Sequence, residues 1–218
     1  MIALIRYTSA TMLHSQRYLA PALLFMAAVG VSSSNDSGPL PPTYGLCAAA
    51  LFVCATWFTI ALISIDDPIH RAITIVSARH SGKVLLSSIS VAGISCLVLT
   101  VVGLVLPLLV GTHTVEAADL VLGIEAELTG AAVGIAIGLL CSRLVIRRQG
   151  YALIVALGLV MAVLFARDLS PINVLLRLMA NTTKSSDLVA PIGGLLAIAA
   201  VILVFSSIAT QFVATRKE

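Results

Sequence analysis

The chain has 218 residues, of which 59% are hydrophobic and 11% are charged, and its formal net charge is +3. Soluble domains carry about 25% charged residues, so this composition excludes an ordinary water-soluble globular domain. It predicts instead an all-α integral membrane protein with a single transmembrane domain.

Residues 1–17 precede the first long apolar run. Arg6, His14 and Arg17 lie among apolar residues there, a pattern that differs from a cleavable signal peptide. We therefore expect an interfacial helix over 1–17 and a first span that inserts uncleaved.

Six apolar runs follow this segment. A bilayer core about 30 Å thick requires roughly 20 helical residues. The runs predict spans at about 18–34, 44–65, 84–110, 127–144, 149–166 and 188–213. The first run is the shortest, and it crosses the bilayer only if its helix extends beyond 18–31.

The basic residues predict how these spans are oriented. Lys and Arg collect in cytoplasmic loops. With six spans and a cytoplasmic N-terminus, ten of the thirteen basic residues lie inside, and only Arg167, Arg177 and Lys184 lie outside. The sequence therefore predicts a multi-pass protein of the inner (plasma) membrane with both termini in the cytoplasm.

The cytoplasmic loop 66–83 is predicted to contain a helix. Asp67 and Pro68 suit its start and Gly82 suits its end. One apolar stripe with helical spacing runs along it, formed by Ile69, Ala72, Ile73 and Val76. Such a helix either lies along the membrane surface or docks in a groove of a cytoplasmic partner. The residues available for docking are Asp66, Asp67, Pro68, His70, Arg71, Arg79 and His80.

Two features mark the predicted fourth span. Gly130, Gly134 and Gly138 recur at four-residue spacing, which favours close approach of a neighbouring helix over a substrate-lining groove. Glu125 and Glu127 lie at the predicted outer start of this span, where the helix dipole stabilises carboxylates.

The outer segment 167–187 is predicted to contain a short helix. Ser170 can cap a helix that begins at Pro171 and is too short to cross the bilayer. Arg177 lies among apolar residues and should extend to the lipid headgroups or line a cavity. The alternative interpretation of Glu125 and Glu127 is an outer gate, to which Arg177 would contribute.

Chemistry-bearing motifs are scarce elsewhere. The four cysteines stand singly in apolar runs and are interpreted as small packing residues. Residues 77–84 lack the first glycine and the Ser or Thr of a phosphate-binding loop. We therefore expect a chain that is not catalytic and binds no cofactor or metal.

The whole pattern resembles the membrane-spanning permease subunit of type-two ABC exporters, the bacterial drug, antibiotic and polysaccharide exporter class. Six spans, a helix before the first span and a helical inner loop after the second carry this resemblance. The segment Ser-Pro-Ile-Asn-Val-Leu-Leu-Arg at 170–177 is similar to the family's Asn-Pro-Leu segment after span five, with Ser in place of Asn.

The resemblance implies that a separate ATPase subunit binds ATP and Mg and docks against 66–83. A second permease subunit, identical or related, would complete the translocation path. The scarcity of charge in the spans favours an amphipathic or lipid-like substrate, and no nucleic acid partner is expected. A non-transporting scaffold, assembly or immunity protein is the alternative function. An ion-coupled carrier is disfavoured because the spans lack buried carboxylates.

Overall fold

The structure is a computed structural model that describes residues 2–33, 39–65, 74, 76, 81–110, 116–145, 149–167, 170–182 and 184–217. This part of the chain is helical and contains no strand, which confirms the predicted all-α class. Its principal helices are α1 (Ile2–Ser15), α2 (Leu19–Ser33), α3 (Leu40–Ile63), α5 (Ser81–Val110), α6 (Ala117–Leu140), α7 (Gln149–Phe165), α8 (Pro171–Asn181) and α9 (Ser185–Lys217).

Within the described ranges, four helices are long and apolar enough to cross a membrane: α3, α5, α6 and α9. This agrees with the prediction of a membrane-embedded protein. The helices α2 and α7 are also apolar but have 15 and 17 residues. At about 1.5 Å per residue, they span roughly 22 and 25 Å, so the count of six spans remains a prediction.

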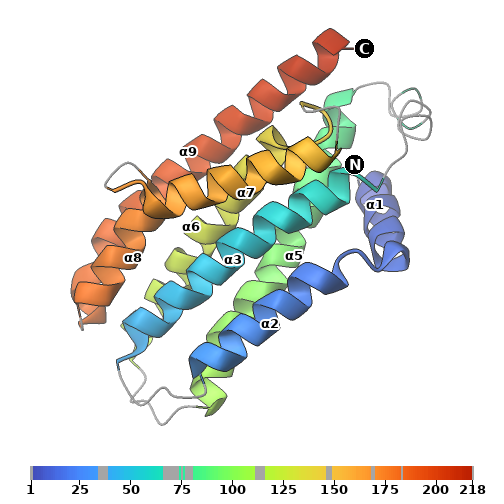
Figure 1. Ribbon diagram of the computed structural model, residues 1–218. Helices are drawn as coiled ribbons and strands as arrows, with labels where there is room; N and C mark the ends of the chain where they lie inside the picture. Colours follow the sequence, from blue (N-terminus) through green and yellow to red (C-terminus); the bar gives the residue numbers. More distant parts are fainter. Residues whose placement is uncertain are drawn as a thin grey trace.

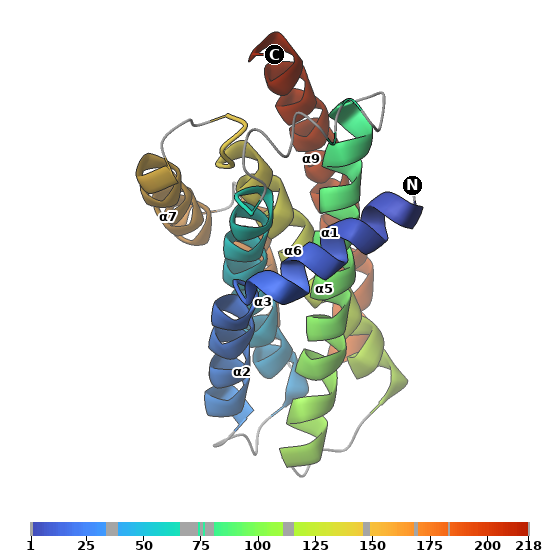
Figure 2. The ribbon, with the colours of Figure 1, turned by 90° about the vertical axis from the view of Figure 1, so that its right-hand side faces the viewer.

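Successive apolar helices alternate in direction along the bundle (Figure 1). The C-terminus, the end of α3 and the start of α5 lie at one end, and α8 lies at the opposite end. Helix α1 lies across the bundle against α5 (Figure 2). The chain turns from α1 into α2 at Gln16, whose φ of 53° is left-handed. Beside this turn, Arg17 Nη1 donates to the carbonyl of Ser64, 3.3 Å away, and so ties it to the end of α3.

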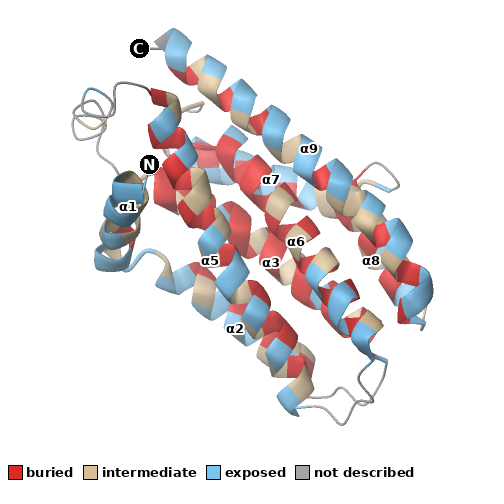
Figure 3. Ribbon diagram, turned by 180° about the vertical axis from the view of Figure 1, so that it is seen from behind, coloured by how far each residue is buried: buried red, intermediate tan, exposed pale blue. Residues whose placement is uncertain are grey.

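The centre of the bundle is the pair α3 and α6, which pack against each other more extensively than any other two helices. Most of their residues are buried, whereas α9 keeps a long exposed face (Figure 3). The glycine stripe of α6 lies at this contact. A Cβ added at Gly130 would be 2.4 Å from the carbonyl oxygen of Ala48, and one at Gly134 would be 2.5 Å from that of Phe52. Glycine therefore lets α6 lie directly on the backbone of α3.

Helix α6 differs most from its predicted span. It begins at Ala117, ten residues before the predicted start at 127, and it ends at Leu140. Asp119 stabilises this earlier start, because its Oδ2 accepts a hydrogen bond of 2.9 Å from the backbone N–H of Glu116. Glu125 and Glu127 are consequently about 12 and 15 Å from the first residue of α6. The helix dipole acts only within the first turn, so the prediction that it stabilises these two carboxylates is wrong.

Helix α8 begins at Pro171 as predicted and closes one end of the bundle. It buries Ile172, Leu175 and Met179 on one face, and the amide of Asn173 donates to the carbonyl of Leu164, 2.6 Å away on α7. Ser170 precedes the helix, but its side chain forms no capping hydrogen bond. Burial of an apolar face and the bond to α7 therefore position this helix.

Candidate functional site

The most unusual side chain of the described core is Glu127. It lies in the middle of α6 and is 0% exposed. Neither carboxylate oxygen has a hydrogen-bond partner among the described residues. Burying an unpaired carboxylate in an apolar interior is costly, and such groups at membrane depth mark functional sites. The expectation that the spans lack buried carboxylates is therefore wrong.

Helix α5 supplies the surface on which this carboxyl group lies. A Cβ added at Gly103 would be 2.4 Å from Oε1 of Glu127 and 2.9 Å from Oε2. Only glycine leaves room for the carboxyl group at this point. Thr100, one turn earlier on α5, places its side chain near the same group. Its buried hydroxyl has no hydrogen-bond partner within the described ranges.

Helix α3 contributes Tyr44 to the same region. Its ring packs on Gly123 of α6, where an added Cβ would lie 3.2 Å from two ring carbons. The side chain is 0% exposed, and its hydroxyl has no hydrogen-bond partner in the part of the chain that the structure describes. The phenol is close enough to interact electrostatically with both Asp119 and Glu127. Tyr44 thus lies between two carboxyl groups that are about 12 Å apart along α6.

Asp119 differs from Glu127 because it has partners. One oxygen accepts from the backbone N–H of Glu116, and the other accepts from the hydroxyl of Ser185 at the start of α9. This carboxyl group therefore joins the starts of α6 and α9. We define the buried polar cluster as Tyr44, Thr100 and Glu127, with Asp119 on the side where α6 begins.

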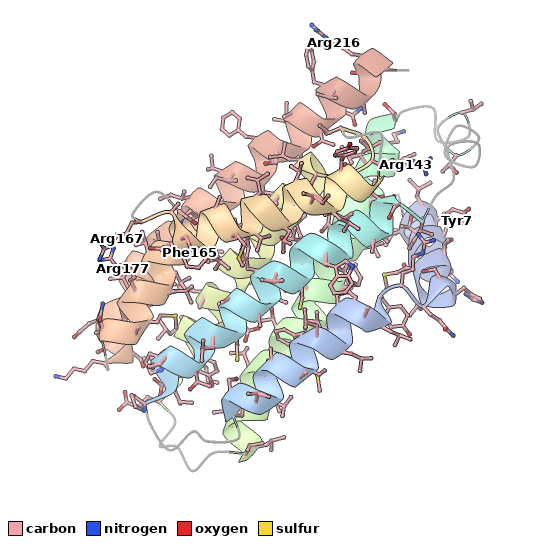
Figure 4. All side chains as sticks on the ribbon, in the orientation of Figure 1. Tyr7, Arg143, Phe165, Arg167, Arg177 and Arg216 are labelled. Carbon is pink, nitrogen blue, oxygen red and sulfur yellow. The ribbon has the colours of Figure 1, made fainter. Side chains whose placement is uncertain are left out.

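The three residues of the predicted outer gate lie in different surroundings. Glu125 turns towards α9, where an added Cβ at Gly193 would be 3.3 Å from its Oε1. Glu127 is enclosed between α5 and α6. Arg177 is exposed on α8, and Arg167 lies at the same end of the bundle (Figure 4). The structure therefore does not bring Glu127 and Arg177 together in one site.

The predicted ATPase-docking residues fall outside the described residues: Asp66, Asp67, Pro68, His70, Arg71, Arg79 and His80. Among the residues that are described, no group of three or more His, Cys, Asp and Glu side chains is placed to hold a metal ion. The four cysteines Cys47, Cys54, Cys96 and Cys141 are buried, and none of them forms a disulfide in the structure.

Sequence reasoning missed Tyr44, Thr100 and the two glycines of this site, Gly103 and Gly123. A signal was present on α6 itself, because Gly123, Glu127 and Gly130 lie on one helical face. That face is continuous with the glycine stripe, so Glu127 had to point towards a closely packed neighbour.

A second feature is an apolar groove of about 430 Å³ between the start of α5 and the end of α9. Its walls are mostly aliphatic and aromatic, with Leu85 and Leu86 on α5 and Ile208 and Phe212 on α9. Gln211 crosses the groove and donates to the hydroxyl of Ser81, 3.0 Å away.

No family model matches the chain, and no curated protein or solved structure matches it either.

Proposed function

We propose that this chain is the permease subunit of a type-two ABC exporter in a bacterial inner membrane. In this proposal six spans cross the membrane, both termini are cytoplasmic, and a second permease subunit completes the path for an amphipathic or lipid-like substrate. A separate ATPase subunit binds and hydrolyses ATP with Mg, and this chain has no catalytic role.

The observation that carries the proposal is the order and placement of the helices. A helix lies across the bundle before the first apolar helix, the apolar helices alternate in direction, and the short α8 closes the end opposite the C-terminus. This order resembles the arrangement of the exporter permeases. The hydrogen bond from Arg17 to Ser64 supports it further, because it links the turn after α1 to the segment that leads into the proposed docking loop.

The apolar groove between α5 and α9 supports the proposed substrate class. It lies at the end of the bundle that holds the C-terminus, which is the cytoplasmic end in this proposal. A mostly apolar wall with Ser207, Gln211 and Thr215 along it suits a molecule with an acyl or ring portion and a small polar group.

The test is to purify the tagged chain from membranes of its own source and to measure ATP hydrolysis and subunit composition. We expect an ATPase subunit to co-purify and to be lost when Arg71→Glu and Arg79→Glu reverse the charge of the docking loop. Arg167→Glu is the control, because it reverses one charge at the end of the bundle that holds α8.

An ATPase-free preparation of the unchanged chain would contradict the proposal and favour the scaffold or immunity alternative. Retention of the ATPase by the doubly reversed variant would contradict docking at 66–83.

A further inference from the structure

We propose that the buried polar cluster is a proton-binding site, and that Glu127 carries a proton whenever α5 packs against α6. The proposal rests on the surroundings of this carboxyl group and is independent of any ATPase partner.

Glu127 lies deep in the bundle, where an ionised carboxylate is costly. The residue is about 15 Å from the first residue of α6 and about 20 Å from its last, so it lies near the middle of a helix that is long enough to cross a membrane. Its side chain is sealed from solvent by the surrounding helices. An ionised carboxylate at such a position requires a cation or several hydrogen-bond donors.

Among the described residues, the neighbouring helices supply no cation and only two hydroxyl donors. The titratable group that faces Glu127 from α3 is Tyr44, which is neutral near pH 7. Helix α5 contributes the Thr100 hydroxyl, which is a single uncharged donor, and the bare backbone at Gly103. On α6 itself the nearest acid towards the outer end is Asp119, and Glu125 faces α9. Neither Glu127 oxygen accepts a hydrogen bond from a Lys, Arg or His among the described residues.

A bound proton neutralises the buried carboxylate better than a metal ion could. A protonated carboxyl group is neutral, gains one O–H donor and keeps an acceptor oxygen. The Thr100 hydroxyl can accept from that donor, because hydroxyl groups both donate and accept. A hard cation would need about six oxygen ligands, and two hydroxyl groups and one carboxyl group provide fewer.

The contact with Gly103 links this proton to helix packing. The carboxyl group fills the space that a Cβ would occupy on α5, so the two helices leave no room for water around the acid. Loss of the proton creates a charge that needs water, and water can reach the group only if α5 moves away from α6. Asp119 and Tyr44 are the polar groups on the side of Glu127 where α6 begins.

Infrared spectroscopy of the full-length chain in phosphatidylcholine vesicles tests the proposal, because protonated carboxylic acids have a C=O stretch that carboxylates lack. At about pH 7 we expect this band in the unchanged chain. Glu127→Gln should remove that component, and Glu125→Gln should retain it. Absence of the band from the unchanged chain, or its persistence in Glu127→Gln, would overturn the proposal.

A second pair of variants leaves Glu127 in place and covers the case in which Glu127→Gln does not fold. Gly103→Ala forces a methyl group against the carboxyl group and should shift the frequency of the band. Gly93→Ala lies on the same helix with nothing within 4 Å of its added Cβ and should leave the frequency unchanged. An unshifted band in Gly103→Ala would also overturn the proposal.

Discussion

Gly103 of α5 and Glu127 of α6 fit together so closely that a single added methyl group would lie 2.4 Å from Oε1 of the glutamate. A real Cβ does not approach an oxygen so closely, so the side chain or the helix must move. The contact between these two helices therefore depends on the absence of a side chain at position 103.

Gly103→Ala should destabilise the fold by about 1–3 kcal/mol, the usual range for overpacking a core. The measurement is the free energy of unfolding in a mixed-micelle denaturation monitored by circular dichroism. Gly93→Ala on the same helix has open space around its added Cβ and should change the free energy by less than about 0.5 kcal/mol. Equal losses in the two variants would show that the Gly103 contact is unimportant.

Gly134→Ala should cost more than Gly103→Ala in the same assay. The obstacle at Gly134 is the backbone oxygen of Phe52, at 2.5 Å, and a backbone cannot turn aside as the end of a glutamate side chain can. The helices α3 and α6 must separate instead, which disturbs the most extensive contact of the bundle. Gly158→Ala on α7, with nothing within 4 Å, is the control. A smaller loss at Gly134 than at Gly103 would contradict this ranking.

Stability should depend on pH through Glu127 if the folded chain holds this residue in its neutral form. In an unfolded chain a glutamate ionises above about pH 4.3, so the stabilisation is complete below that pH and is lost as pH rises. Glu127→Gln is neutral at every pH. Its melting temperature relative to the unchanged chain should therefore rise as the pH increases above about 4.3. Asp187→Asn, at an exposed position in the first turn of α9, should show no such trend, and a flat difference for Glu127→Gln would count against the neutral form.

Asp119→Asn should loosen the start of α6. The change weakens the bond to the Glu116 backbone and the bond from the Ser185 hydroxyl, and a lost helix cap costs about 1 kcal/mol. Hydrogen exchange of the first amides of α6 should accelerate. Ser185→Ala removes only the bond between the helices and should leave those amides closer to their original rate. Identical exchange in both variants would argue against a capping role for Asp119.

The predicted orientation can be tested with single introduced cysteines. Arg167→Cys and Asn181→Cys are exposed at the α8 end of the bundle, and Arg143→Cys is exposed after the end of α6. A membrane-impermeant maleimide added to intact cells should label the first two and not the third. The four natural cysteines are buried and should add little background. Labelling confined to position 143 would reverse the orientation.

The apolar helices could be predicted because hydropathy is a local property of the sequence. The start of α6 could not, because Asp119, Glu125 and Glu127 interrupt the apolar run and suggest a boundary, whereas caps and packing against α3 and α9 extend the helix through them. The candidate site could not be predicted from the sequence either. Its groups come from three helices, and only the folded bundle shows that Thr100 and Tyr44 face the acid.

The glycine stripe of α6 has a mechanical consequence. Side chains normally separate two helix backbones and let them slide by changing rotamers, but Gly130 and Gly134 bring α6 onto the carbonyl groups of α3, where no side chain is available to yield. These two helices should therefore move as one rigid body. In any conformational cycle the helices around this pair should therefore move instead. Helix α7 has few contacts with the rest of the bundle, so it has the greatest freedom to move.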